Sequence, residues 1–252
     1  MNSKMSMSIK GKKALVTGAS QGLGRVIAIM LAKEGCHVVI NCAHNPQKAE
    51  AVASEIRENG GEASICICDI SDETAVRKMF ADLGGVDILV NNARIDPYFR
   101  NPEMSDGDWW DLVMRINLKG AYLCSQAFFD QAKERGWGRI VNIASVRSFI
   151  PAEPNMIAYG VSKLGMHGIT RAFAQNGAAF GITANTVCPG MVLTENITKR
   201  ITEEQMKASE AKIPVGRGGT CEEMADAVLF VIKNAYVTGE TIHVNGGAYY
   251  AP

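Results

Sequence analysis

Residues 15–28 read LVTGASQGLGRVIA and lead from a short apolar run into a segment with helical periodicity. Three glycines, Gly18, Gly22 and Gly24, lie in the turn between the two. Gly18 permits a tight turn, Gly22 lets the backbone approach a pyrophosphate, and Gly24 allows close packing of the helix. The N-terminus of that helix offers unpaired N–H groups to an anion. The stretch therefore predicts a dinucleotide-binding loop, with an ordinary glycine-rich turn as the alternative.

Short β-rich runs alternate with longer helical patterns along the rest of the chain. The expected strands lie at residues 13–18, 37–42, 63–69, 87–93, 139–145, 182–190 and 241–247, and helical patterns cover residues 24–35, 45–60, 72–84 and 108–136. Several strands are apolar on both faces, as parallel strands between two helical layers must be. The sequence shows no linker or repeat. Residues 1–252 are therefore expected to form a single α/β domain: a doubly wound Rossmann fold whose seven-stranded parallel sheet carries helices on both faces.

Composition excludes several classes of partner. Lys and Arg together number 26, as do Asp and Glu, so no basic excess points to nucleic acid. No apolar run approaches the roughly 18 residues of a membrane span, and the first twenty residues lack the apolar core of a signal peptide. We expect a cytoplasmic protein with no nucleic-acid or membrane partner. Cys66 and Cys68 form a C-x-C pair, but without a second pair they are interpreted as small buried hydrophobes, and no metal is expected.

The end of the second strand usually distinguishes NAD from NADP. An acidic side chain there binds the ribose 2′-hydroxyl, whereas a nearby cation accepts a 2′-phosphate. Here the residues are Cys42, Ala43 and His44, with neither an acid nor an arginine among them, and Gln21 in the glycine loop is also neutral. The sequence predicts NAD or NADP as cofactor and leaves the preference open.

The spacing of Tyr159 and Lys163 points to proton transfer. Residues four apart lie on one face of a helix, and an ammonium group beside a phenol favours the phenolate. Such a tyrosine can exchange a proton with an alcohol or carbonyl oxygen. Ser145 ends the fifth strand fourteen residues earlier and offers a hydroxyl for the same oxygen. Asn117 lies inside a predicted helix, where an amide is a poor helix former unless it has a task or is satisfied by neighbouring backbone.

Seven motifs together resemble the short-chain dehydrogenase/reductase family in its compact branch. They are TGASQGLG, Asp69 in CDIS, NNA, RINLKG, Ser145, YGVSK and CPGMVLT, and with the C-terminal third they extend the resemblance from about Gly11 to Gly247. The resemblance implies an NAD(P)-dependent oxidoreductase that interconverts a secondary alcohol and a ketone or aldehyde by hydride transfer. It also implies a homotetramer, with the helices of Asn117 and Tyr159 at an interface.

The resemblance also assigns roles to residues. Tyr159 would be the general acid/base, Lys163 would lower its pKa and bind the nicotinamide ribose, and Ser145 would orient the substrate. Asn117 would hold a water that links Lys163 to solvent. The implied cofactor-binding residues are Gly18, Ser20, Gln21, Gly22, Leu23, Gly24, Cys42, Ala43, His44, Asp69, Ile70, Asn92, Ala93, Tyr159, Lys163, Pro189, Gly190, Val192 and Thr194. Residues of about 191–213 resemble the mobile lid that closes over substrate in this family.

The chain departs from the family pattern most clearly at Arg94, which stands where the family usually has glycine. Arg94 and Arg147 follow the fourth and fifth strands, so together with Ser145 they are candidate substrate contacts. Arginines near one cleft suggest a small anionic substrate of the sugar or hydroxy-acid type. The alternative is that they pair with Asp96, Asp106, Glu153 or a neighbouring subunit. Two other functions remain open: a non-catalytic nucleotide-binding sensor or scaffold, and a nucleotide-sugar epimerase.

Overall fold

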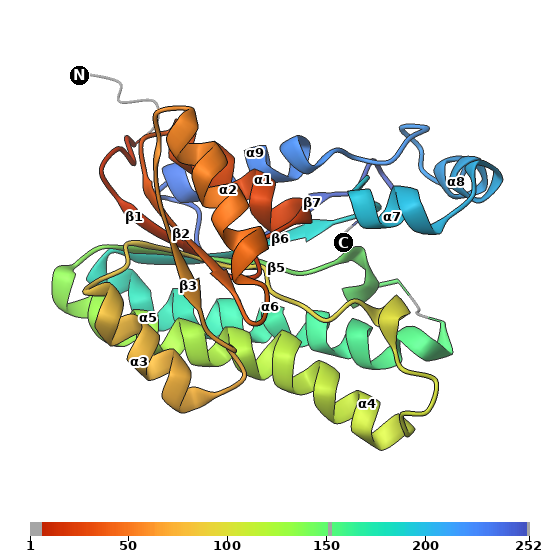
Figure 1. Ribbon diagram of the computed structural model, residues 1–252, viewed down its shortest axis with the longest axis horizontal. Coiled ribbons are helices and arrows are strands. Elements are labelled where there is room, and N and C mark those ends of the chain that lie inside the picture. Colours follow the sequence, from red (N-terminus) through yellow and green to blue (C-terminus); the bar gives the residue numbers. More distant parts are fainter. Residues whose placement is uncertain (1–6, 151–152, 251–252) are drawn as a thin grey trace.

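The computed structural model describes residues 7–150 and 153–250, and its named strands all lie in one sheet (Figure 1). The strands are β1 (Lys13–Val16), β2 (His37–Cys42), β3 (Glu62–Ile67), β4 (Ile88–Asn91), β5 (Gly138–Ile143), β6 (Ile182–Pro189) and β7 (Thr241–Val244). Their order is β3-β2-β1-β4-β5-β6-β7, and every pair of neighbours is parallel. The predicted seven-stranded parallel sheet is confirmed.

Helices cover both faces of this sheet. They are α1 (Gly22–Lys33), α2 (Pro46–Glu58), α3 (Glu73–Leu83), α4 (Asp106–Val113), α5 (Gly120–Arg135), α6 (Ile157–Gly177), α7 (Glu195–Arg200), α8 (Glu203–Glu210) and α9 (Cys221–Lys233). Figure 1 shows α1, α2 and α9 on one side and α3, α4, α5 and α6 on the other. Alternate residues of β1 serve the two layers, because Ala14 and Val16 pack in the α1 and α9 core and Leu15 in the α5 and α6 core.

The helical pattern predicted over residues 108–136 contains an irregular turn. Residues Met114–Lys119 form a π-helical turn between α4 and α5, so the chain stays helical but gains an extra residue at this point. Asn117 lies in this turn and is fully buried. Such turns are frequent at functional sites, and an apolar periodicity read from the sequence does not reveal them.

The order of the strands reverses between β1 and β4, which are neighbours in the sheet. Crossovers leave these two strands toward opposite faces, and the gap beyond their carboxyl ends is where open α/β sheets bind ligands. The glycine loop follows β1, and the β4–α4 loop (residues 92–105) follows β4. Short 3₁₀ turns occur at Pro97–Phe99, Val146–Ser148, Pro154–Met156 and Ala178–Phe180.

Within the described part of the chain, no helix is long and apolar enough to cross a membrane. In the same residues, no group of three or more His, Cys, Asp or Glu side chains is placed to hold a metal ion. Cys68 is buried, and burial raises the pKa of its thiol to about 11. A thiol of this kind is a poor metal ligand because the thiolate is the binding form.

Candidate functional site

The glycine loop packs tightly against the end of β4 because two of its glycines have no room for a side chain. Gly18 has a left-handed backbone with φ of +62°, and a Cβ there would lie 2.7 Å from the Cα of Ala93. At Gly24, a Cβ would lie 2.7 Å from the carbonyl oxygen of Gly18. Both positions therefore require glycine. This geometry matches the tight turn and the close helix packing expected of these two residues.

Gly22 has open space in place of a side chain. Its φ is +57°, and no atom lies within 4 Å of a Cβ built there. Gly22 begins α1, where the preceding Gln21 makes no side-chain cap and the first turn holds no acidic residue. The free N–H groups and the positive end of the helix dipole thus meet an uncrowded surface. Ser20 is half-buried and Leu23 packs into the core, so the backbone of this loop fits a dinucleotide pyrophosphate.

The end of β2 carries no acidic side chain. Cys42 is buried, Ala43 is half-buried and His44 is exposed. On the first turn of α2, the Nζ of Lys48 donates a hydrogen bond to Oε1 of Gln21 across 3.0 Å. Among the residues that the structure describes, Lys48 forms no ion pair, so its ammonium group could contact a phosphate.

Asp69 and Ile70 follow β3 but differ in exposure. The Oδ1 of Asp69 accepts a hydrogen bond from the N–H of Ser71 at 2.9 Å. Partial burial acts to raise the pKa of Asp69, but hydrogen bonds from Ser71 and two nearby basic side chains lower it overall. Ile70 is 5% exposed and packs on Gly120, where a Cβ would lie 2.7 Å from its Cδ1. The Ile70 side chain is therefore used in packing, next to Asp69 at the carboxyl end of β3.

Asn92 and Ala93 join the end of β4 to the glycine loop. Their backbone N–H groups both donate to Oγ1 of Thr17 at 3.0 Å. The Nδ2 of Asn92 donates to the carbonyl oxygens of Thr17 and Gly18 at 2.9 and 3.1 Å. Both N–H donors of the Asn92 side chain are thus used to hold the loop, and only its Oδ1 is left for a ligand.

Tyr159 and Lys163 lie one turn apart on α6, as their spacing predicts. Tyr159 is 9% exposed and Lys163 is 1% exposed. The Nζ of Lys163 lies 5.8 Å from the centre of the Tyr159 ring and donates a hydrogen bond to the carbonyl oxygen of Ile143 at 2.7 Å. Because Ile143 ends β5, the ammonium group is fixed at the carboxyl edge of the sheet.

Burial controls the protonation of this pair. Burial, with a further contribution from the nearby Arg94 guanidinium, lowers the pKa of Lys163 to about 7. Burial also raises the pKa of Tyr159, while Arg94 and the Ser145 hydroxyl oppose that rise. A buried phenol that keeps its proton near neutral pH is suited to donate that proton to a carbonyl oxygen.

Ser145 lies directly after β5, next to Tyr159. Its Oγ accepts a hydrogen bond from the N–H of Arg147 at 3.2 Å. A serine hydroxyl has one donor and two acceptor positions, and its proton can rotate between the Tyr159 oxygen and a substrate oxygen. The Arg147 side chain is half-buried and forms no ion pair with any residue that the structure describes.

Asn117 connects two elements of the site. Its Oδ1 accepts a hydrogen bond from the N–H of Ile95 at 2.8 Å, and its Nδ2 donates to Oγ of Ser162 at 3.2 Å. The Ser162 hydroxyl in turn donates to the carbonyl oxygen of Tyr159 at 2.7 Å. The side chain thus ties the β4–α4 loop to the helix of Tyr159. One N–H of the amide, one lone pair of its oxygen and the backbone carbonyl of Asn117 are left by these contacts and could bind a relay water.

Residues 189–194 lead from β6 into α7. Together with residues 217–220, which lead from α8 back to α9, they form the connection between the body of the protein and the α7–α8 segment, here called the neck. Pro189 ends β6, and at Gly190 a Cβ would lie 2.8 Å from the Cα of Asn245. Val192 is buried and pairs with Gly219 in an isolated parallel bridge. Thr194 accepts a hydrogen bond from the N–H of Ile197 and so caps α7. The segment from α7 to α8 therefore leaves the body of the protein from a fixed base.

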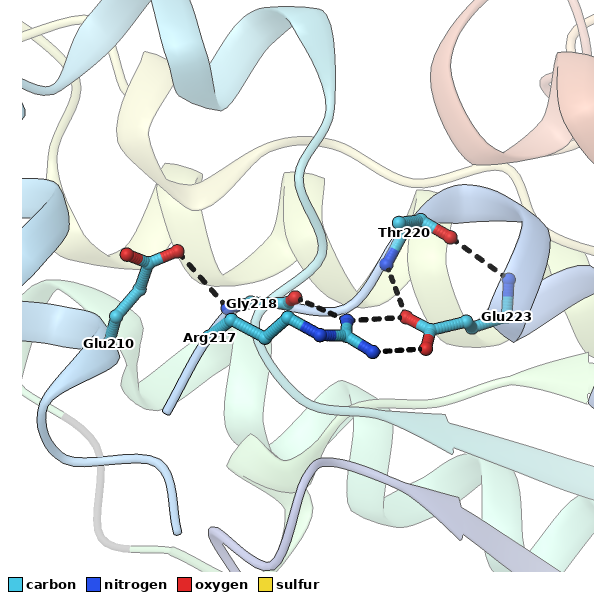
Figure 2. A network of polar contacts seen from close by, with 5 residues as sticks. All are labelled: Glu210, Arg217, Gly218, Thr220 and Glu223. Carbon is cyan, nitrogen blue, oxygen red and sulfur yellow. Dashed lines mark hydrogen bonds and ion pairs between the residues drawn. The ribbon is translucent and has the colours of Figure 1, made fainter. Parts of the chain in front are cut away.

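The far side of this neck is held by a polar network (Figure 2). The guanidinium of Arg217 donates two hydrogen bonds to the carboxylate of Glu223, at 2.9 and 2.6 Å. Glu223 also accepts from the N–H of Thr220 at 2.8 Å, which completes the cap of α9. Glu210, at the end of α8, accepts from the N–H of Gly218 at 3.2 Å. Both ends of the α7–α8 segment are thus anchored.

The candidate substrate contact Arg94 forms an ion pair in the β4–α4 loop. Its Nη1 lies 3.2 Å from Oδ2 of Asp96. Asp96 is one of the partners that the sequence offers as an alternative to a ligand. The same carboxylate receives Arg200 from the end of α7, with 3.5 Å between Nη1 and Oδ1. Arg200 is absent from the residues that the sequence singles out, because nothing local in residues 195–201 shows that this side chain meets residue 96.

Known proteins resemble this chain in sequence and in fold. The family model for short chain dehydrogenases matches residues 12–205. The chain is 37% identical over 244 residues to a 3-oxoacyl-[acyl-carrier-protein] reductase of Staphylococcus aureus, covering 94% of this chain and 98% of that one. It is 39% identical over 246 residues to the reductase of the same name from Vibrio cholerae, covering 96% and 99%. The crystal structure of a gluconate 5-dehydrogenase from Burkholderia cenocepacia, in complex with NADP and tartrate, matches with a TM-score of 0.86 at 32% identity, covering 95% and 96%.

The chain belongs to the short-chain dehydrogenase family. It is an NAD(P)-dependent oxidoreductase that acts on CH–OH groups and the corresponding carbonyls. The predicted family and reaction class are confirmed, and neither the non-catalytic scaffold nor the sugar epimerase is favoured.

Proposed function

We propose that this chain catalyses reversible hydride transfer between NADP(H) and a small hydroxy acid or oxo acid of the sugar-acid type, with Tyr159 as general acid/base. The observation that carries the proposal is the position of Arg94 in the loop after β4, where its guanidinium pairs with Asp96 at 3.2 Å and its charge acts on both Tyr159 and Lys163. A cation beside the proton donor favours a substrate with an anionic group near the reacting carbon. Residues 1–252 would work as one domain, with residues of about 191–213 as its lid.

A bound nicotinamide supplies or accepts the hydride at its C4 atom. In the reducing direction, Tyr159 gives its proton to the substrate oxygen, and in the oxidising direction it takes the proton back. Ser145 donates a hydrogen bond to the same oxygen and so fixes its distance from the phenol. Lys163 holds a positive charge next to the phenolate that forms during reduction and therefore stabilises it.

The environment of the adenosine end supports a preference for NADP. Lys48 and His44 are the basic side chains near the end of β2, and Cys42 and Ala43 carry no charge to repel a 2′-phosphate. We expect Lys48→Glu to raise the KM for NADPH by about tenfold and to change the KM for NADH little, because one charge-assisted contact is lost. Equal effects on the two cofactors would contradict this assignment.

The substrate class can be tested by absorbance at 340 nm. The assay compares sodium D-gluconate, sodium tartrate, neutral polyols and a 3-oxoacyl thioester, each with NAD(H) and NADP(H). We expect turnover of at least one acid, and a rise of about tenfold in its KM in Arg94→Ala and Arg147→Ala. Turnover of the thioester alone, or unchanged KM values in both variants, would rule out the hydroxy-acid substrate.

The protein is also proposed to act as a cytoplasmic homotetramer. Large apolar side chains are exposed on α4, α5 and α6, namely Trp110, Tyr122, Ile157, Val161 and Leu164. A groove of about 630 Å³ lies between these helices and is lined by Leu118, Tyr122 and Ile169 among others. A second copy of the chain would cover this face. Sedimentation of Leu164→Glu as a smaller species than the wild type would support the interface, and an unchanged mass would argue against it.

A further inference from the structure

One carboxylate is shared by two arginines that are far apart in the sequence. Asp96 lies in the β4–α4 loop and pairs with Arg94 at 3.2 Å and with Arg200 at 3.5 Å. The Arg200 guanidinium also stacks on the Tyr98 ring, with 3.8 Å from Cζ to the ring centre. Two guanidinium charges face a single carboxylate, so the cluster keeps a net charge of +1.

Both ion pairs on Asp96 have longer nitrogen–oxygen distances than the other arginine ion pairs that the structure describes. Arg217 contacts Glu223 through two hydrogen bonds, the shorter at 2.6 Å, whereas neither arginine on Asp96 makes a hydrogen bond to it. Charge-assisted hydrogen bonds normally span about 2.7–2.9 Å. The Nη1 of Arg200 is buried from solvent and has no hydrogen-bond acceptor among the residues that the structure describes. The cluster therefore holds N–H donors that are not in use.

This cluster lies beside the proposed general acid, because Ile95, between Arg94 and Asp96, is linked through Asn117 and Ser162 to the carbonyl oxygen of Tyr159. The charges of Arg94 and Asp96 both act on Tyr159, the proposed general acid. Arg200 is the last residue of α7, and α7 and α8 leave the body of the protein from a fixed neck. The side chain of Arg200 thus connects the lid segment to the loop that borders Tyr159. An anion placed between the two arginines would contact both the lid and the body of the protein.

We propose that Arg94 and Arg200 together bind the carboxylate of the substrate, and that Asp96 occupies this position as an internal counter-ion when no substrate is bound. This inference rests on the proposed hydroxy-acid function and deepens it, because it assigns the specificity for acids to one residue of the lid and one residue of the β4–α4 loop. A substrate carboxylate can accept the donors that Asp96 leaves unused. Binding of the acid would then hold the lid against the β4–α4 loop.

The roles of Arg200 and Asp96 predict opposite effects of substitution. Calorimetry with the NADP⁺-bound protein measures the Kd of sodium D-gluconate and of D-glucitol, the neutral polyol of equal chain length. Arg200→Gln should weaken gluconate binding about tenfold or more, and Arg200→Lys should restore part of it. Asp96→Asn should tighten gluconate binding severalfold, because asparagine keeps the Oδ1 that accepts from Tyr98 but removes the competing charge. Glucitol binding should not change, and Arg77→Gln on the distant helix α3 is the matched control.

Three results would overturn this proposal. Gluconate binding that weakens equally in Asp96→Asn and Arg200→Gln would mean that the ion pairs only hold the loop. Equal losses of affinity for gluconate and glucitol in Arg200→Gln would mean that Arg200 shapes the site without distinguishing a charged ligand from a neutral one. If the wild type oxidises neutral polyols but binds no gluconate, the two-arginine site is wrong while hydride transfer by Tyr159 stands. If no substrate is turned over at all, the proposed function fails, and gluconate binding still decides the site.

Discussion

Lys163 holds its ammonium nitrogen 5.8 Å from the centre of the Tyr159 ring and 2.7 Å from the carbonyl oxygen of Ile143. The hydrogen bond to the end of β5 keeps the charge at the carboxyl edge of the sheet although Lys163 is 1% exposed. Burial and the Arg94 charge lower the pKa of Lys163 to about 7, so its charged and neutral forms are both present near neutral pH. Substitution of Lys163 can therefore separate its effect on Tyr159 from its effect on the stability of the fold.

Lys163→Met should reduce kcat at pH 7 by a factor on the order of 10² or more, because the phenolate of Tyr159 loses its nearest support. The folded protein should be as stable as the wild type or more so, since an apolar side chain of similar length replaces a buried charge. Rate measurements and urea unfolding check the two statements together. A variant that unfolds but retains its rate per folded molecule would show that Lys163 has only a structural role.

The glycine loop offers a matched pair of substitutions. Gly18→Ala should cost about 2–4 kcal/mol of unfolding free energy, because its Cβ would meet the Cα of Ala93 and its φ is left-handed. Gly22→Ala meets no atom within 4 Å and should cost only about 1 kcal/mol, for its left-handed φ alone. However, its methyl group would enter the space proposed for the pyrophosphate, so NADP⁺ should bind at least tenfold more weakly. Denaturation and cofactor titration distinguish these effects, and similar results for both variants would contradict the assignment.

Asn117 is expected to act as a positioning residue. Asn117→Ala would leave the N–H of Ile95 and the hydroxyl of Ser162 without their partner, and each is part of the link between the β4–α4 loop and Tyr159. We expect a loss of about 2–3 kcal/mol in stability and a drop in kcat that is larger than the change in KM for NADP⁺. Asn117→Asp keeps the acceptor for Ile95 and should recover part of the stability. Failure of the aspartate to do so would argue against the contact with Ile95.

The burial of His167 predicts how the free energy of unfolding depends on pH. Burial lowers its pKa to about 4, whereas an unfolded histidine titrates near 6.5. Between these values the unfolded chain binds a proton that the folded chain does not, so stability is lost as pH falls from about 6.5 to 4. The loss should be on the order of 2 kcal/mol. Urea unfolding at pH 7 and pH 5 should show a smaller loss in His167→Gln than in the wild type, and no such difference in His44→Gln at an exposed position. An undiminished loss in His167→Gln would contradict this origin.

The sheet could be predicted from the sequence because parallel strands buried on both faces leave unbroken apolar runs. The residues after β1, β4, β5 and β6 could also be located, since ligand sites of such sheets lie at the carboxyl ends of strands. Contacts across long sequence distances could not be predicted. The π-helical turn at Asn117 leaves no trace in the apolar pattern, and the sequence does not show that Arg200 reaches Asp96. Nor does the sequence show that the side chain of Ile70 packs on Gly120, where the start of α5 runs close to the end of β3.

The central claim is that Tyr159 exchanges a proton with the oxygen of the substrate. The most direct measurement compares Tyr159→Phe with the wild type, using the best acid from the panel and following NADPH at 340 nm. The ring keeps its buried place, so NADP⁺ should bind within about threefold of the wild type, while kcat should fall by a factor of about 10²–10⁴. A phenylalanine variant that retains kcat within a few-fold of the wild type would contradict the account.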